Sequence, residues 1–372
     1  MKKLHRRPSR FKGLTVGLDL HKSFTQISVL CEAGDEIQAD RIASRPAALL
    51  KLIDTLTDDG QAVQVTLEAS GCFLWAYDLL VDRLGRAQVH VAAPSRVRVI
   101  ADSMEKNDAN DAWWLAYLLW EGRLPGAFVA EGDLRELRIA SRELRSVVDE
   151  RSDLKRRLKS HLAQLGLSFS ASDWASTPGR LRIVALVQEV KAEHGVRGES
   201  IDRLWGRIQT LDEEVDHWRG RVDALASSFD QVQVLKRSLP GVGPQTAAVI
   251  WSELGDPRRY ASAKSYAKAT GLTPGYRESG GRMSRGKITR LGSAHVRWAL
   301  TRAVLSCTRC TQDPAGRAVR AWLERAQKRK PKKAAIVAAA RKLAEAIWRL
   351  FALGEAFDLT RAFGAPPADA AA

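Results

Sequence analysis

Four acidic residues in the first third of the chain have the types and spacing of a two-metal site. Asp19 and Glu68 each stand at the edge of an apolar run that reads as a buried strand. Charged side chains in such places are costly unless they are paired or bind a metal. Asp108 and Asp111 are three residues apart, so on a helix they share one face. Together these carboxylates could hold two Mg²⁺ ions about 4 Å apart, which would stabilise the attacking and leaving oxygens at a phosphate.

Each of these acids also has an ordinary structural interpretation. Asp108 or Asp111 could cap the start of a helix, which is a common use of aspartate. Lys22 and Lys106 lie close to the acids in sequence and could contact a phosphate, although a solvated lysine is the usual case. His21 could support a metal ligand or simply make a local hydrogen bond.

A second candidate for chemistry is Ser279 in the basic, glycine-rich segment 271–292. Gly280 and Gly281 let a backbone approach a phosphate closely and leave the serine hydroxyl exposed. The cations around it are Arg277, Arg282, Arg285, Lys287 and Arg290. A serine among arginines can attack a phosphodiester and hold the 5′ end covalently. Ser-Gly-Gly is also ordinary loop chemistry, so this alternative stays open.

The sequence 240-PGVGP-244 before an apolar helix is typical of a helix-hairpin-helix element. Gly241 and Gly243 would allow the backbone to come close to a phosphate. N–H groups at a helix start bind phosphate without reading sequence. A simple turn is the alternative.

The charge of the chain favours a polyanionic partner. Its 372 residues carry 59 basic and 43 acidic side chains, giving a net charge of +16 and a pI near 10. This favours nucleic acid first and an anionic membrane second. No segment has the length of a transmembrane helix and the first residues lack an apolar signal core. We therefore expect a cytoplasmic protein that associates with nucleic acid.

The cysteines and the basic runs give weaker signals. Cys31 and Cys72 stand in apolar contexts typical of a core. Cys307 and Cys310 form a single CxxC with no second ligand pair nearby, so a zinc site is not supported. Basic runs at residues 151–159 and 325–333 would contact phosphate backbones or be solvated helix faces.

Hydrophobic patterning predicts a mixed α/β sheet in the first part of the chain. Two strands joined by a turn in 14–30 and a third near 36–43 precede alternating helices and strands. The later elements are helices 46–58, 72–84, 95–105 and 108–121 and strands 61–70 and 87–94.

Two long heptad patterns follow. The pattern in 134–165 is interrupted, whereas 201–232 has ten consecutive apolar a and d positions. These positions are Ile201, Leu204, Ile208, Leu211, Val215, Trp218, Val222, Leu225, Phe229 and Val232. The helices could pair within the chain or across a dimer, and an ordinary helical bundle is the alternative. Segment 166–200 contains a short helix near 181–190 and no recognisable role.

The last third is expected to be mainly helical around one loop or hairpin at 271–292. The segment 239–254 reads as a tight turn that enters an apolar helix, and further helices are expected at 263–270, 293–310, 315–327 and 334–353. The end of the chain, 364–372, has the composition of disorder.

These motifs together resemble the transposases of the bacterial insertion sequences called IS110. GLDLHK, LEASG and KNDANDA resemble the family's DEDD motif in a RuvC-like, RNase H-type fold. The segment from LPGVGPQ to ESGGRMSRGKITRLG resembles the second domain, which carries the family's serine. The match covers nearly the whole chain, with Asn107 where the family more often has threonine.

The patterns and this resemblance together predict a basic arm at 1–13, a RuvC-like DEDD domain at 14–130 and a coiled-coil helical region at 131–234. A serine-containing transposase domain at 235–355 and a disordered tail at 356–372 would follow. Asp19, Glu68, Asp108 and Asp111 would bind two Mg²⁺ ions, for which Mn²⁺ could substitute, and Ser279 would be the nucleophile.

The resemblance also implies partners. A structured noncoding RNA would pair with donor and target double-stranded DNA, while the protein reads shape and backbone. Homodimers would assemble into tetramers, with sites composed from different protomers. Two alternatives stay open: a RuvC-like Holliday-junction endonuclease that uses water, and a non-catalytic nucleic-acid-binding scaffold.

Overall fold

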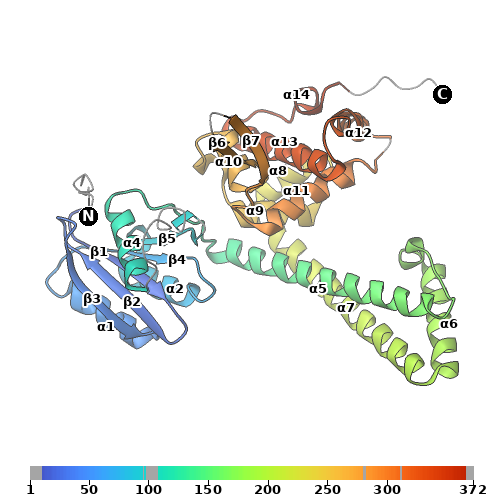
Figure 1. Ribbon diagram of the computed structural model, residues 1–372, viewed down its shortest axis with the longest axis horizontal. Helices are drawn as coiled ribbons and strands as arrows, with labels where there is room; N and C mark the ends of the chain where they lie inside the picture. Colours follow the sequence, from blue (N-terminus) through green and yellow to red (C-terminus); the bar gives the residue numbers. More distant parts are fainter. Residues whose placement is uncertain (1–10, 95, 98–107, 280–281, 311, 366–372) are drawn as a thin grey trace. The chain divides into compact units, whose positions relative to one another are not determined.

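The computed structural model describes residues 11–94, 96–97, 108–279, 282–310 and 312–365; the side chains of 108, 109, 171, 276–279 and 282–285 are not described. The chain forms two compact units, Met1–Val129 and Ala130–Ala372 (Figure 1). The five-part division expected from the resemblance stays a prediction.

The first unit is built on a five-stranded mixed sheet with the order β3-β2-β1-β4-β5 (Figure 1). β1 pairs antiparallel with β2 and parallel with β4; β2–β3 is antiparallel and β4–β5 is parallel. The strands are β1 Leu14–Leu20, β2 Phe24–Leu30, β3 Glu36–Ala43, β4 Val63–Glu68 and β5 Val89–Ala92. Central strands of such sheets are buried on both faces, which explains their nearly continuous apolar runs. The predicted mixed α/β sheet is confirmed.

Helices cover both faces of this sheet. α1 (Pro46–Thr57) and α2 (Leu74–Leu84) pack on the face that carries Val16 and Leu18. α4 (Asp108–Trp120) packs on the opposite face, to which the alternate residues of β1 belong. The helix expected at 95–105 lies almost wholly outside the described residues.

The second unit begins with a long helical hairpin. α5 (Gly132–Ala163) packs against α7 (Gly195–Ser227), and α6 (Thr177–Glu193) lies at the far end of the pair (Figure 1). The heptad helices therefore pair within the chain, the first of the two expected possibilities.

The expected seam through Val232 is wrong at its end. α7 stops at Ser227, and Val232 belongs to the next helix, α8 (Asp230–Ser238). Ser227 turns its hydroxyl back to the Ala224 carbonyl at 2.7 Å, and Phe229 is extended. Serine side chains compete in this way for helical backbone groups, so a serine pair can end a helix that its apolar pattern would continue.

The remaining helices enclose a core that is continuous with the helical hairpin. A two-stranded antiparallel hairpin, β6 (Pro274–Ser279) and β7 (Arg282–Ile288), stands between them. The helices are α9 Pro244–Leu254, α10 Ala263–Ala269, α11 Ala294–Cys307, α12 Pro314–Gln327, α13 Lys332–Ala352 and α14 Leu359–Phe363. The mainly helical remainder is thus confirmed.

The tail expected from residue 356 needs correction at its start. α14 lies inside it, and the Phe363 side chain is buried with only 1% exposed. The Phe363 ring meets Trp322 of α12 edge-on, with centroids 5.9 Å apart. Across the described residues, no helix is both long and apolar enough to span a membrane.

Candidate functional site

The register of two parallel strands brings Asp19 and Glu68 side by side. β1 pairs with β4 so that Gly17 faces Thr66 and Leu18 faces Leu67, and the two acids are the next residue of each strand. Partners in a parallel register point to the same face of the sheet. Both carboxylates therefore belong to one face, at the carboxyl ends of neighbouring strands. The Asp19 side chain is 14% exposed.

Gly17 determines how closely α4 approaches these acids. Gly17 lies two residues before Asp19 and therefore on the same face. A Cβ at Gly17 would lie 2.0 Å from the Ala112 carbonyl oxygen and 2.7 Å from the Ala116 nitrogen. The α4 backbone thus touches β1 directly, which only glycine permits.

The direction of α4 brings its acidic first turn toward the same end of the sheet. At the far end of α4, Trp120 donates its indole N–H to the Glu32 carbonyl at 3.0 Å and packs on Leu30. Leu30 pairs with Thr15 near the start of β1. The opposite end of α4, which carries Asp111, therefore points toward the carboxyl end of β1.

The positions of the predicted metal ligands are therefore partly defined. Asp19, Glu68 and the half-buried Asp111 belong to one face of the sheet and its covering helix. Asp108 begins α4, but its side chain lies outside the described residues, as does Lys106. Among the described residues no three acidic, histidine or cysteine side chains meet closely enough to hold a metal. Lys22 is exposed at the turn after β1.

Ser279 belongs to the second unit, at the tip of the β6–β7 hairpin. It pairs with Arg282, the last pair before the connection made by Gly280 and Gly281. Both glycines lie outside the described residues, as do the side chains of Ser279 and of Arg277, Arg282 and Arg285. Lys287 and Arg290 are exposed further down the hairpin.

The base of this hairpin is fixed by backbone contacts. Arg290 has a positive φ of 55°, and its N–H donates to the Gly271 carbonyl at 3.2 Å. Arg297 of α11 donates to the carbonyls of Arg290 and Gly292. A Cβ at Gly292 would lie 2.1 Å from the Ala269 carbonyl oxygen. The strand that leaves Ser279 is therefore held against α10 and α11.

The predicted helix-hairpin-helix turn joins α8 to α9, and its two glycines have different surroundings. Gly241 has φ +72°, and a Cβ there would lie 2.1 Å from the Ala303 carbonyl oxygen of α11. Internal packing thus explains Gly241. Gly243 faces open space at the start of α9, beside a groove of about 540 Å³ that Lys236 and Arg237 also line. The phosphate role of both glycines stays a prediction.

A buried ion pair that the sequence analysis missed lies behind this region. Arg142 of α5 donates two hydrogen bonds, at 2.7 and 3.0 Å, to the Glu253 carboxylate of α9, whose side chain is 4% exposed. Burial opposes ionisation of Glu253, but the Arg142 hydrogen bonds prevail and lower its pKa. Arg138 donates to the Ser252 carbonyl at 2.8 Å, and burial lowers its own pKa to about 10. In the sequence, the signal for this ion pair was a single charged residue, Glu253, in an otherwise apolar helix.

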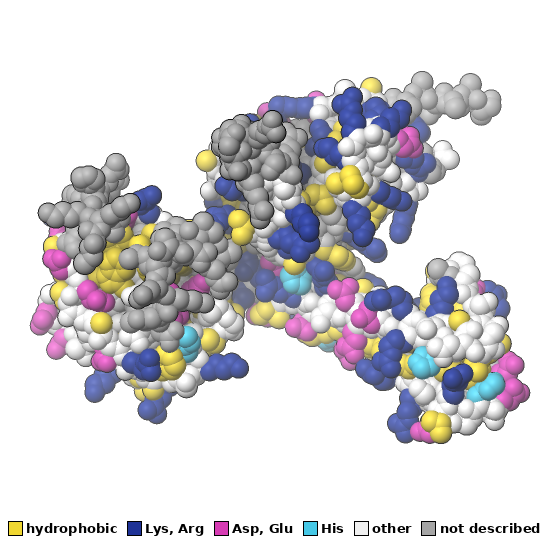
Figure 2. Space-filling model, viewed as in Figure 1, with side chains coloured by type: hydrophobic (Ala, Val, Ile, Leu, Met, Phe, Trp, Pro, Cys, Tyr) yellow, Lys and Arg dark blue, Asp and Glu magenta, His cyan; other side chains and the backbone are white. Residues whose placement is uncertain are grey.

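Part of the basic run 151–159 is paired within the chain. Arg151 and Lys155 of α5 both approach Asp212 of α7, at 2.6 and 3.5 Å. Figure 2 shows more Lys and Arg side chains than acidic ones on the visible face of the helices that follow the α5–α7 helical hairpin. Cys307 is buried, and burial raises the pKa of its thiol to about 11, as suits a core residue.

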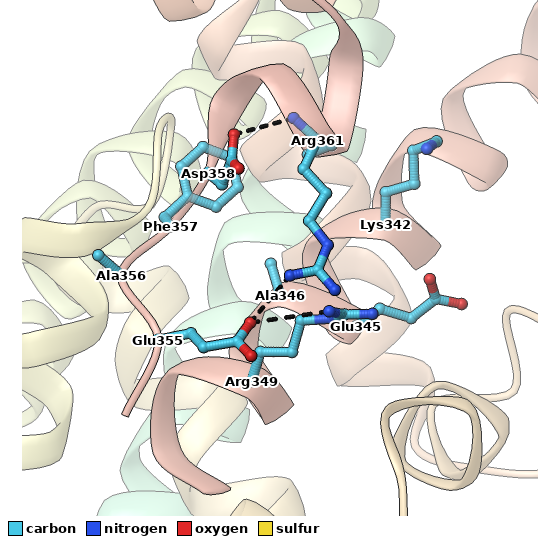
Figure 3. Close-up of a pocket in the computed structure, with 10 residues that line it drawn as sticks. Lys342, Glu345, Ala346, Arg349, Glu355, Ala356, Phe357, Asp358 and Arg361 are labelled. Carbon is cyan, nitrogen blue, oxygen red and sulfur yellow. Dashed lines mark hydrogen bonds and ion pairs between the residues drawn. The ribbon is translucent and has the colours of Figure 1, made fainter. Parts of the chain in front are cut away.

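A small cavity of about 110 Å³, lined by none of the predicted site residues, lies between α13 and the segment entering α14 (Figure 3). Arg349 and Arg361 point toward the same Glu355 carboxylate, at 3.7 and 3.0 Å (Figure 3). The charged residues that line the cavity are thus largely paired with one another. These ion pairs hold the end of the chain against α13.

Comparison with known proteins places these two regions in one family. The DEDD transposase model of IS110 elements matches residues 16–166, which include the three acids placed above and Asp108. The model described as "Transposase IS116/IS110/IS902 family" matches residues 234–319, which include the turn before α9 and the β6–β7 hairpin. The chain belongs to the IS110 family of transposases. The resemblance inferred from the motifs is confirmed.

Individual relatives of this IS110-family transposase are distant but cover most of its length. It is 25% identical over 77% of the chain to the "Probable family 20 transposase" of Pseudomonas aeruginosa, spanning 83% of that protein. A Sinorhizobium fredii protein with the transposase name y4pF/y4sB is 24% identical over 94% of the chain and 87% of its own length. The transposase for insertion sequence element IS1328 of Yersinia enterocolitica is 22% identical over 74% of the chain and 80% of its own length.

The family gives a general function to the two regions. An insertion-sequence transposase is an enzyme that cuts and rejoins DNA, and the DEDD region suggests that a divalent metal takes part. Carboxylate oxygens are the ligands that a hard divalent cation prefers, so the described donors fit such an ion by their chemical type, while no three of them meet among the described residues.

Proposed function

We propose that this transposase cuts DNA with the Ser279 hydroxyl as nucleophile, assisted by Mg²⁺ held by Asp19, Glu68, Asp108 and Asp111. The observation that carries the metal part is the parallel β1–β4 register, which aligns Asp19 with Glu68 on the face covered by α4. Mn²⁺ would substitute for Mg²⁺, because both accept oxygen ligands in similar geometry.

The sheet of the first unit supports a RuvC-like, RNase H-type fold for this region. Three antiparallel strands come first, and two further strands then join parallel to β1. Both strand acids stand at carboxyl ends, and a third acid enters from the covering helix. This arrangement puts the strand carboxylates on one face of the sheet, which supports the proposed metal site.

The chemistry is a double exchange of phosphodiester bonds. Ser279 Oγ would form a bond to the scissile phosphorus and lose its proton, while the bond to the 3′ oxygen breaks and a 3′-OH is released. After strand exchange, a 3′-OH would attack the 5′-phosphoserine and return the serine hydroxyl. Energy is kept in the covalent link, so no ATP is required. Bound Mg²⁺ would stabilise charge on the phosphate oxygens.

Sequence specificity in this proposal comes from a structured noncoding guide RNA that pairs with donor and target DNA. The net charge of +16 and the exposed cations Lys22, Lys287 and Arg290 support contact with nucleic acid backbones. A dimer that assembles to a tetramer would supply the acids and Ser279 from different protomers.

A covalent-trapping assay tests the proposal. The full chain, RNA transcribed from the flanking noncoding DNA, and labelled donor and target duplexes are mixed with Mg²⁺ and resolved under denaturing conditions. We expect a protein–DNA band that vanishes with Ser279→Ala and when the RNA is left out. An adduct that persists in Ser279→Ala would exclude Ser279 as nucleophile.

The same assay separates the alternatives. Cleavage without a covalent band would point to a water-using junction endonuclease. Binding without cleavage under any metal condition would point to a scaffold. Asp19→Ala is expected to abolish Mg²⁺-dependent cleavage while nucleic-acid binding, measured by gel shift, stays close to wild type.

A further inference from the structure

The Asp19 carboxylate is hydrogen-bonded to a histidine in the turn that follows β1. His21 Nε2 lies 2.9 Å from Asp19 Oδ2. An ionised carboxylate can only accept, so the imidazole must carry its hydrogen on Nε2. One of the two Asp19 oxygens is therefore held by a side chain only two residues away.

The imidazole is itself fixed by a stack of side chains. The His21 ring lies parallel to the Phe24 ring, with centroids 4.4 Å apart and planes at 26°. The backbone N–H of His21 also donates to the Phe24 carbonyl at 2.9 Å, which closes the turn. On Phe24 lies the Arg41 guanidinium, 4.2 Å from the ring centroid, as a cation–π contact.

Cross-strand register continues this arrangement. Asp19 of β1 stands opposite Gln26 of β2, and Gln26 stands opposite Arg41 of β3. The Arg41 Nε–H donates to Gln26 Oε1 at 3.4 Å. Three neighbouring strands thus contribute to one row that ends on Asp19.

We propose that His21 is a positioning residue for Asp19: its Nε2–H fixes the rotation of the carboxylate, and Phe24 with Arg41 fixes the imidazole. The inference rests on the proposed metal site and adds to it a residue outside the acid quartet. A ligand carboxylate that is held in one rotation loses less freedom when a cation binds. Removing such a supporting hydrogen bond typically weakens metal affinity by about 10–100-fold.

The bland alternative is that the contact only stabilises the turn between β1 and β2. In that case every change at His21 would lower folding stability, and metal affinity would follow stability. Two substitutions separate these roles. His21→Phe keeps an aromatic ring on Phe24 but has no N–H, whereas His21→Gln loses the ring and keeps an amide N–H donor at a similar reach.

The experiment measures Mn²⁺ binding to the full chain by the loss of the free-ion electron paramagnetic resonance signal, together with thermal unfolding. We expect His21→Phe to bind Mn²⁺ about 10–100-fold more weakly while its unfolding temperature stays near wild type. His21→Gln is expected to keep most of the Mn²⁺ affinity even if its unfolding temperature falls.

Asp19→Asn is the control that keeps the two hypotheses apart. If Asp19→Asn leaves Mn²⁺ binding intact, the proposed metal site itself is wrong. If Asp19→Asn loses Mn²⁺ but His21→Phe binds it like wild type, the metal site stands and the role of His21 is overturned. Equal loss of affinity in His21→Phe and His21→Gln, in step with stability, would also overturn it.

Discussion

Replacing Gly17 with alanine should damage the proposed metal site without changing any charged residue. The new Cβ would lie 2.0 Å from the Ala112 carbonyl oxygen, whereas ordinary contact begins at 3.4 Å. The position of the Cβ is fixed by the backbone of a central strand, and the oxygen belongs to the backbone of a helix, so neither atom can rotate away. α4 must therefore recede by about 1.4 Å and carry Asp111 with it.

The expected cost has two parts. Overpacking of this kind destabilises by about 1–3 kcal/mol. Misplacement of a reacting group by about 1 Å can lower a rate by roughly 100-fold. We therefore expect Gly17→Ala to fold with a reduced unfolding temperature, and its Mg²⁺-dependent cleavage rate to fall by roughly 100-fold, far beyond what partial unfolding at the assay temperature would explain.

The assay compares cleavage rates and thermal unfolding of wild type, Gly17→Ala and Gly126→Ala. Gly126 is a matched control in the same unit, because it is exposed and the nearest atom to its added Cβ is the Val91 carbonyl oxygen at 4.0 Å. Gly126→Ala should behave like wild type. A Gly17→Ala protein that cleaves at the wild-type rate would refute the reasoning that α4 positions part of the site.

Two further predictions concern the second unit. Arg142→Met should cost about 3 kcal/mol, measured by chemical denaturation, because the buried Glu253 loses its two Arg142 hydrogen bonds and keeps only Ser293 and the charge of Arg138. In wild type, the lowered pKa of Glu253 contributes stability at pH values above the ordinary glutamate pKa. This contribution is lost as the pH falls through the folded-state pKa. In Arg142→Met burial should instead raise that pKa, so the unfolding temperature should rise as pH is lowered from about 7 toward 5; an unchanged pH profile would contradict this. Gly241→Ala should lower the unfolding temperature, because its Cβ would lie 2.1 Å from the Ala303 carbonyl oxygen. Gly243→Ala should leave the unfolding temperature unchanged, because its Cβ would face open space. If the turn approaches a phosphate, Gly243→Ala should weaken DNA binding in a gel shift.

Local pattern predicted most elements of this fold. Alternating and continuous apolar runs gave the strands of the first unit, and periods of three to four residues gave α5, α7 and the later helices. These signals are local, because they reflect how each segment buries its own apolar face. They failed where a local competitor acted, as at Ser227, where a serine pair ends the helix before the heptads do.

The candidate site could be predicted only in part, for a physical reason. Residue type and spacing singled out Asp19 and Glu68, since a charge at the edge of a buried run is costly without a purpose. These two acids are neighbours because β1 pairs in parallel with β4. In the chain, β2, β3 and α1 lie between these two strands. Pairing of that kind is set by the whole core.

By itself, the sequence determined the elements, the basic charge, the acidic and serine motifs and the family. Only the tertiary structure decided that α5 and α7 pair within one chain, that Gly17 admits the α4 backbone, and that Arg142 neutralises a buried Glu253. Each of these depends on atoms that are distant in sequence and come together only when the core is packed. Composition and periodicity carry no record of such contacts.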